Sequence, residues 1–202
     1  DAGNDQLFGG SGNDNISASA GQNIAFGGLG DDTITFGSIL NPLTESQQAF
    51  GGEGADFIAG ADGNDLLDGG AGDDELRGGL GNDTINGGAG NDTVQGGAGN
   101  DFITTGDGND RVEDQSLDPE DNNADVIFTG AGMDTVQLSS GAGHLIDTGA
   151  DDDTVTLAGN ASGTVLGGAG NDSLTGNNNQ FGVYDGGTGN DMINAQGLLI
   201  GG

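Results

Sequence analysis

The stretch "GGLGNDTINGGAGNDTVQGGAGNDFIT", residues 78–104, repeats nearly the same nine residues three times. The period continues without a slip from Gly51 to Glu113, in the form G-G-x-G-x-D-x-U-x with U aliphatic. We number the positions of this word from 1 to 9. Position 4 holds Gly54, Gly63, Gly72, Gly81, Gly90, Gly99 and Gly108; position 6 holds Asp56, Asp65, Asp74, Asp83, Asp92, Asp101 and Asp110; and position 8 holds Ile58, Leu67, Leu76, Ile85, Val94, Ile103 and Val112.

Each position of the word has a physical reason. One aliphatic residue flanked by outward-pointing residues forms a strand too short to survive alone, so neighbouring words must stack into a sheet. Glycines allow positive φ and close backbone approach, which lets a six-residue turn direct its carbonyl oxygens into a shared space. Aspartate adds charged oxygen there. Hard oxygen ligands without nearby His or Cys select Ca²⁺, so the repeat predicts calcium sites between stacked turns.

The composition of the 202 residues limits both the fold and the partners. The chain has 33 Asp and Glu against 2 Lys and Arg, a formal charge of −31, 46 Gly and no Cys. Such a chain would be disordered unless repetition, partner chains or bound cations stabilise it. The same charge argues against nucleic acid and acidic membrane surfaces as partners. No apolar run is long enough to span a membrane.

These words resemble the RTX calcium-binding repeat family over essentially the whole chain. The resemblance implies an all-β, right-handed parallel β-roll, a solenoid with two nonapeptides per turn, calcium between turns and a thin aliphatic core. Roughly ten turns, about 48 Å long, would bind roughly ten Ca²⁺ ions. By the same resemblance, the ligands on one edge are Asp56, Asp74, Asp92 and Asp110, and those on the other edge are Asp65, Asp83 and Asp101.

The sequence departs from the regular word before residue 51. Residues 1–35 begin the roll with a truncated first repeat, and Asp14 and Asp32 belong to complete words. Between them, Asn23 occupies the ligand position, so we expect weak calcium binding or none there. Residues 36–50 interrupt the period. Asn41 followed by Pro42 can start a helical turn, and this insertion is either a surface loop or an element that docks a partner.

Beyond residue 113 the repeat changes again. Residues 114–119 read as a plain loop, and residues 120–202 form a second part of the roll with calcium mainly on one edge. Complete words there carry Asp134, Asp153, Asp172 and Asp191, nineteen residues apart, and Asp125 precedes them. The intervening ligand positions hold His144, Gly163 and Phe181, and the core positions hold Ile146, Val165 and Val183. We expect His144 to be a solvated turn residue and Phe181 to replace an ion by packing.

The sequence carries no catalytic motif that the repeat does not explain. There is one His, no H-E-x-x-H, no G-x-S-x-G and no P-loop, so we expect no enzymatic activity in this segment. Arg77 and Arg111 flank core positions and are expected to pair with neighbouring carboxylates. The predicted function is therefore cation binding and structure.

Binding of roughly ten ions would change the formal charge to about −11, so we expect folding to be coupled to calcium. The family resemblance implies export unfolded through type I secretion by Gram-negative bacteria and folding outside the cell. Two roles remain open: a structural module of a cell-surface or extracellular protein such as an S-layer protein or adhesin, or the secretion and folding domain of a toxin or secreted hydrolase. The chain begins and ends within the repeat, which indicates a piece of a longer protein that either continues or self-associates.

Overall fold

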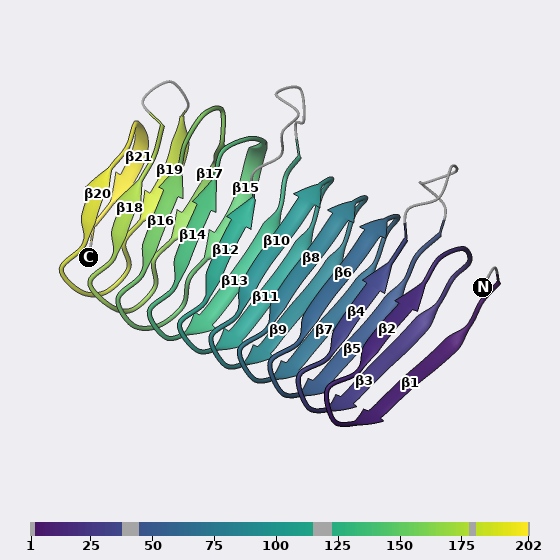
Figure 1. Cartoon of the computed structure of the whole chain (residues 1–202). Coiled ribbons are helices and arrows are strands. Elements are labelled where there is room, and N and C mark those ends of the chain that lie inside the picture. The colour runs from purple at the N-terminus through teal and green to yellow at the C-terminus, as the bar shows by residue number, and fades with distance from the viewer. Residues whose placement is uncertain (1–2, 38–44, 115–122, 178–180, 202) are drawn as a thin grey trace.

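The computed structural model describes residues 3–37, 45–114, 123–177 and 181–201, and every regular element in these ranges is a β-strand. The strands form two parallel sheets that face each other (Figure 1). The odd sheet contains β1 (Gln6–Ser11), β3 (Ile24–Leu29), β5 (Gln48–Glu53), β7 (Leu66–Ala71), β9 (Thr84–Ala89), β11 (Phe102–Asp107), β13 (Val126–Ala131), β15 (Ala142–Asp147), β17 (Ser162–Leu166), β19 (Gly182–Asp185) and β21 (Gly197–Ile200).

The even sheet contains β2 (Asn15–Ala18), β4 (Thr33–Phe36), β6 (Phe57–Asp62), β8 (Glu75–Leu80), β10 (Thr93–Ala98), β12 (Arg111–Asp114), β14 (Thr135–Leu138), β16 (Thr154–Leu157), β18 (Ser173–Thr175) and β20 (Met192–Asn194). Each strand pairs with the strand two places along the chain, so that Val94 lies between Leu76 and Val112. One coil of this regular part therefore contains two nine-residue words. The chain is an all-β solenoid of about ten coils, which confirms the predicted fold class.

The core is the row of position 8 side chains that the two sheets direct toward each other. Leu67, Ile85 and Ile103 from the odd sheet, and Leu76 and Val94 from the even sheet, are all fully buried. Residues on either side of each core residue point outward, as the period of two in a strand requires. The stack thus buries a continuous aliphatic strip that no single word could bury.

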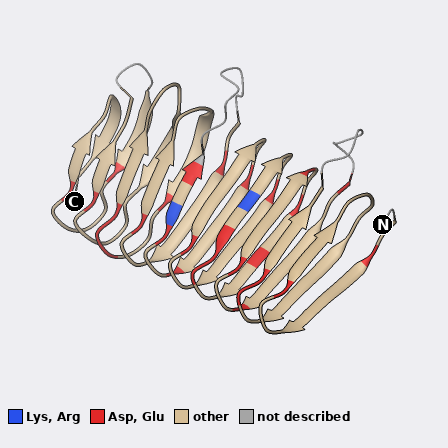
Figure 2. Cartoon of the chain, in the orientation of Figure 1, with Lys and Arg blue, Asp and Glu red and all other residues tan. Residues whose placement is uncertain are grey.

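The turns between the sheets define two long edges of the roll. We call the turns from an odd strand to the following even strand the first edge, which runs along the lower side of Figure 1. The turns from an even strand to the following odd strand form the second edge. Most acidic residues lie in these turns, and a smaller number lie on the strands (Figure 2).

The interruption of the roll is shorter than the sequence predicted for residues 36–50. Strand β4 includes Phe36, and β5 begins at Gln48, with Ala49 buried in the core position and Phe50 in the strand. The helical turn expected after Asn41 lies outside the described residues. Residues 115–119 of the loop expected at 114–119 also lie outside them. The roll therefore resumes earlier in the sequence than Gly51.

The expectation for the last odd strands is wrong by one residue. Tyr184 pairs with Val165 and is 1% exposed, whereas Val183 pairs with Thr164 and is only partly buried. Because side chains alternate between faces, a shift of one residue exchanges the inward and outward sets. Phe181 is consequently 82% exposed and does not fill an ion position by packing.

Candidate calcium-binding edges

The position 6 residues of the first edge form a continuous hydrogen-bonded ladder. The backbone N–H of Asp56 donates to Oδ1 of Asp74, in the next coil, at 2.7 Å. The same bond repeats between successive coils at 2.7–3.1 Å. The ladder contains Asp14, Asp32, Asp56, Asp74, Asp92, Asp110, Asp134, Asp153, Asp172 and Asp191. One carboxylate oxygen per coil therefore holds the stack together.

The second edge has a shorter acidic ladder of the same kind. The N–H groups of Asp65, Asp83 and Asp101 each donate to Oδ1 of the aspartate in the next coil, at 2.8, 2.8 and 3.0 Å, and the last acceptor is Asp125. The sequence prediction had placed Asp65, Asp83 and Asp101 together on one edge, and the structure brings them there. Whether any of these groups holds calcium remains a prediction.

The second oxygen of these carboxylates has a different environment. It is buried and accepts no hydrogen bond from the described residues in Asp14, Asp32, Asp56, Asp65, Asp74, Asp83, Asp92, Asp110, Asp172 and Asp191. An unpaired buried carboxylate oxygen is costly, because neither water nor a donor offsets its charge. A row of such atoms at the spacing of the coils requires positive charge to be stable in its ionised form.

A glycine leaves space for that charge at position 1 of the word. A Cβ built on Gly51 would lie 2.2 Å from Oδ2 of Asp56 and 2.5 Å from the carbonyl oxygen of Gly69 in the next coil. On the second edge, a Cβ on Gly78 would lie 2.2 Å from Oδ2 of Asp83 and 2.5 Å from the carbonyl oxygen of Gly96. Carboxylate and carbonyl oxygens thus converge on a space that a side chain would fill. This oxygen-only donor set fits Ca²⁺.

The position 4 glycines are required by backbone geometry. Their φ angles lie between +120° and +148°, a region that L side chains rarely adopt, in Gly54, Gly63, Gly72, Gly81, Gly90, Gly99 and Gly108. A Cβ on Gly72 would also lie 2.0 Å from the carbonyl oxygen of Gly54 in the preceding coil. Both reasons expected from the sequence, positive φ and close approach, hold at these turns.

In the absence of a bound cation, burial raises the pKa of several ladder carboxyls. Desolvation raises the pKa of Asp65, Asp74 and Asp153 to about 7, and that of Asp83 and Asp92 to about 6, against partial lowering by the ladder hydrogen bonds. Neighbouring carboxylates raise the pKa of Asp74 and Asp92 further. The ionised row is therefore unfavourable by itself, and a bound divalent cation would lower these pKa values again, because a nearby opposite charge favours the ionised form.

Sequence reasoning missed a second ladder at position 5. The N–H of Asn82 donates to Oδ1 of Asn64 at 2.8 Å, and the N–H of Asn100 donates to Oδ1 of Asn82 at 2.7 Å. These acceptors lie in the preceding coil, so the position 5 ladder runs opposite to the position 6 ladder. The repeated Asn-Asp dipeptide was the available signal. Its two side chains bind each coil to both of its neighbours.

Sequence reasoning also missed three threonines that lie in successive coils. Thr105, Thr129 and Thr148 occupy position 1 on the first edge, where other coils have glycine, and all three are fully buried. Their hydroxyls donate to the carbonyl oxygens of Thr129, Thr148 and Gly167 in the next coil, at 3.1, 3.0 and 3.0 Å. The threonines therefore link coils directly at the position that glycine leaves open.

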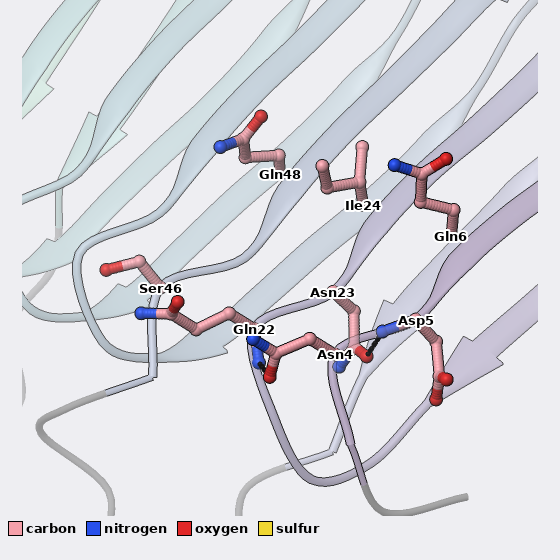
Figure 3. A pocket seen from close by; sticks show the side chains of 8 residues that line it. All are labelled: Asn4, Asp5, Gln6, Gln22, Asn23, Ile24, Ser46 and Gln48. Carbon is pink, nitrogen blue, oxygen red and sulfur yellow. Dashed lines mark hydrogen bonds between the residues drawn. The ribbon is translucent and has the colours of Figure 1, made fainter.

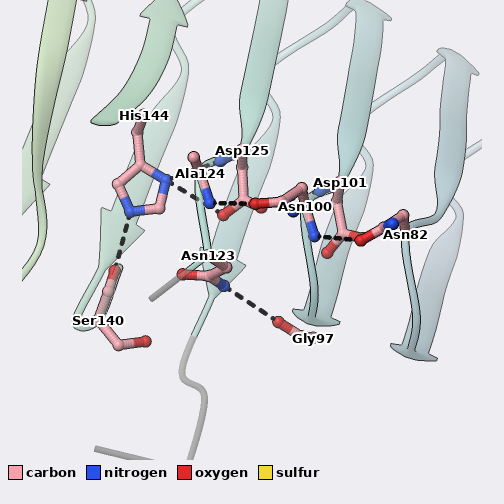
Figure 4. Close-up of polar contacts among 9 residues, drawn as sticks. All are labelled: Asn82, Gly97, Asn100, Asp101, Asn123, Ala124, Asp125, Ser140 and His144. Carbon is pink, nitrogen blue, oxygen red and sulfur yellow. Dashed lines mark hydrogen bonds and ion pairs between the residues drawn. The ribbon is translucent and has the colours of Figure 1, made fainter. Parts of the chain in front are cut away.

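The expectation that His144 is solvated is wrong. Its side chain is buried, its Nδ1 accepts a hydrogen bond from the N–H of Asp125 at 3.0 Å, and its Nε2 lies 2.9 Å from the carbonyl oxygen of Ser140 (Figure 4). The imidazole occupies the position 6 site in the ladder of the second edge. A planar ring fits there because Gly141, whose Cβ would lie 2.5 Å from Nε2, leaves room for it.

Both arginines pair with carboxylates on the outer face of the even sheet, as predicted. Arg77 forms an ion pair with Glu75 and lies over the ring of Phe57, 5.3 Å from its centroid. Arg111 forms an ion pair with Glu113. Neither arginine neutralises the buried carboxylates of the edges (Figure 2).

The fold and these edges define a class of protein: a parallel β-solenoid whose turns carry rows of buried carboxylate oxygens. The sequence profile of the RTX calcium-binding nonapeptide repeat matches residues 1–34, 50–85, 77–112 and 157–179, together more than half of the chain. The chain therefore belongs to the RTX calcium-binding repeat family, whose repeats bind calcium and form structural modules. No curated protein matches the sequence. Among the described residues, no helix is long and apolar enough to cross a membrane.

Proposed function

We propose that this chain is a calcium-dependent structural module of a secreted or cell-surface bacterial protein, of the S-layer or adhesin type, which folds on binding calcium outside the cell. The observation that carries the proposal is the row of buried carboxylate oxygens on each edge, which accept no hydrogen bond from the described residues and face backbone carbonyls. Such rows stabilise a fold only when cations lie between the coils.

Calcium and folding are coupled through charge. Adjacent coils place ladder aspartates about 4.8 Å apart, the spacing of neighbouring strands, so the ionised carboxylates repel one another strongly where water is excluded. The chain carries a formal charge of −31 to which binding of roughly ten Ca²⁺ ions would add about +20. Because the converging oxygens exist only when coils are stacked, the free energy of binding is part of the free energy of folding.

The donor set favours calcium over magnesium. Each space beside a position 1 glycine offers carboxylate and backbone carbonyl oxygens from a turn whose shape the glycines fix. Calcium accepts six to eight such oxygens in flexible geometry, whereas magnesium requires a tighter octahedron and keeps several waters. Moderate affinity suits an environment rich in calcium, such as the cell exterior, where unfolded export through type I secretion would end in folding.

The shape supports a structural role. The described strands form one continuous stack of two sheets, so the calcium-loaded module would be an elongated, stiff spacer whose length is set by the number of coils. Such a spacer suits a surface lattice or a long adhesin. The catalytic residues of a toxin or hydrolase would have to lie in another part of the protein, in which case this segment would serve its secretion and folding.

Circular dichroism titrated with calcium tests the calcium-dependent fold. We expect a β-sheet signal to appear cooperatively with Ca²⁺, to disappear in chelator and not to return with Mg²⁺ at the same concentration. Full β structure in chelator, or equal recovery with magnesium, would contradict the proposal.

Localisation tests the surface role. Antibody against the segment should label intact cells, and electron microscopy of the purified full-length protein in calcium should show sheets or filaments. Dispersed protein with hydrolytic or toxic activity in the medium would instead support the secretion-domain role.

A further inference from the structure

We infer that the calcium row of the second edge is closed at both ends by side chains that replace the ladder aspartate and bind no ion: Asn23 and Gln47 before Asp65, and His144 after Asp125. The inference rests on the proposed calcium-dependent function and identifies the places on the second edge where calcium does not bind. Coils at these stops would hold together without metal.

Asn23 and Gln47 reproduce the ladder bond of an aspartate. The N–H of Asp5 donates to Oδ1 of Asn23 at 3.1 Å, and the N–H of Asn23 donates to Oε1 of Gln47 at 3.0 Å (Figure 3 shows the first bond). The N–H of Gln47 then donates to Oδ1 of Asp65 at 2.7 Å. The ladder of the second edge therefore passes without a break from amide to carboxylate side chains.

The two amides differ from an aspartate at their second polar atom. Where aspartate has a buried oxygen, Asn23 has an NH₂ group that donates to the carbonyl oxygen of Gly21 at 3.0 Å and to Oε1 of Gln47 at 3.1 Å. The NH₂ group of Gln47 donates to the same carbonyl oxygen of Gly21 at 3.0 Å. A backbone carbonyl and a neighbouring side chain are thus satisfied by N–H donors. This end of the row needs no cation and excludes one.

His144 closes the other end by a different chemistry. Its Nδ1 accepts the ladder bond from the N–H of Asp125, and its Nε2 contacts the carbonyl oxygen of Ser140 at 2.9 Å (Figure 4). Nδ1 also lies 3.2 Å from Oδ2 of Asp125. The imidazole supplies no oxygen at the position where the preceding coils have carboxylates, and Ca²⁺ prefers oxygen ligands.

The second edge cannot resume its acidic row beyond His144. Sheet pairing aligns His144 with Gly163, and Thr164 and Val165 with Val183 and Tyr184, which places Gly182 next to Gly163. A Cβ on Gly163 would lie 2.2 Å from the carbonyl oxygen of His144, so a side chain is sterically excluded there. The continuous acidic part of this row is therefore Asp65, Asp83, Asp101 and Asp125, with Asp5 alone on the other side of Asn23 and Gln47, whereas the first edge is acidic from Asp14 to Asp191.

Substitutions that restore carboxylates at the stops test the inference. The double variant Asn23→Asp with Gln47→Glu exchanges each NH₂ for oxygen at constant shape, and His144→Asp restores the ladder residue at the other end. We expect each protein to bind more Ca²⁺ per chain by native mass spectrometry and to require more calcium for half-maximal folding than the unsubstituted protein. Asp83→Asn is the matched opposite change and should lower the number of ions.

Hydrogen exchange on the unsubstituted chain gives a readout that does not depend on a variant folding. As calcium is lowered, the backbone amides of Asp5 and Asn23 should stay protected at concentrations where those of Asp65 and Asp83 have become exposed. Simultaneous loss of protection at all four amides would overturn the inference, as would unchanged ion counts in the carboxylate variants. If the unsubstituted chain bound no calcium, the proposed function itself would fail, and the two failures are thus distinguishable.

Discussion

The N–H of Asp74 donates to Oδ1 of Asp92 at 2.8 Å, while Oδ2 of the same Asp92 side chain is buried and accepts no hydrogen bond from the described residues. One oxygen thus joins two coils, and the other is available to a cation. The two roles can be separated by substitution, because an amide keeps the first oxygen and loses the charge, whereas a methyl group loses both.

Asp92→Asn should therefore lower the number of bound calcium ions and also the calcium concentration needed for half-maximal folding, since a buried charge is removed and the acceptor for the N–H of Asp74 remains. Asp92→Ala should lose the same ions and also be less stable than Asp92→Asn in the same saturating calcium by about 1–3 kcal/mol, the cost of an unsatisfied buried donor. Native mass spectrometry and thermal unfolding measure the two effects. Equal stability of the two variants would show that the ladder bond does not matter.

The pH dependence should change sign with calcium. Burial raises the pKa of Asp65, Asp74 and Asp153 from 3.8 to about 7, so between these values the calcium-free roll binds more protons than the unfolded chain. Its stability should rise as the pH falls from about 7 to about 4, because proton uptake favours the folded state. With calcium bound, protons compete with the ions, and stability should fall over the same window.

The folded fraction by circular dichroism in calcium-depleted buffer, and the unfolding temperature in excess calcium, each at about pH 5 and about pH 7.5, give the two slopes. Metal-depleted buffer is preferable to a chelator, because carboxylate chelators bind calcium weakly at acid pH. Slopes of the same sign in both conditions would show that the buried carboxyls are not the sites where protons and calcium compete.

Much of the fold could be predicted from the sequence because the repeat ties structure to position. The aliphatic residues of position 8, the glycines of position 4 and the two rows of aspartates all lie where a nine-residue period with two words per coil places them. The period works because each coil meets only copies of itself, so one local rule repeats along the stack.

The prediction failed where the chain departs from the repeat, either by a shift of one residue or by a different side chain at position 6. The register of β19 is shifted by one residue, and a sequence pattern cannot locate such a shift when valine and tyrosine are both plausible core residues. His144 and Gln47 were not recognised as ladder members, because hydrogen-bonding capacity at position 6 can be supplied by chemically different groups. These exceptions are set by contacts between coils, which appear only in three dimensions.

Gly72→Ala should be far more damaging than Gly12→Ala. Both glycines have positive φ, +131° and +98°, so both substitutions introduce backbone strain of about 1–3 kcal/mol. Only at Gly72 would the new Cβ also meet a backbone oxygen, that of Gly54, at 2.0 Å, whereas no described atom lies within 4 Å of a Cβ on Gly12. Calcium-dependent folding measured by circular dichroism should be lost or strongly weakened in Gly72→Ala alone. Equal losses would mean that strain, not the approach of the coils, requires these glycines.

Tyr184 offers a spectroscopic probe of the last coils, because it is the only tyrosine and the chain has no Trp. Burial raises the pKa of its phenol above the ordinary 10.0. Absorbance titration at alkaline pH should therefore show a higher apparent pKa in excess calcium than in denaturant. An unshifted titration in calcium would indicate that the Tyr184 ring is not buried in the folded roll.

The register of β19 can be tested by comparing Tyr184→Ala with Phe181→Ala. Tyr184 is 1% exposed and belongs to the core, so its truncation should cost about 3–5 kcal/mol through lost burial and the cavity that remains. Phe181 is 82% exposed, so its truncation should change stability by less than about 0.5 kcal/mol. Denaturant unfolding in saturating calcium measures both. If Phe181→Ala were the damaging change, the strand would have the register that places Val183 in the core, and the second edge would be closed by an aromatic ring.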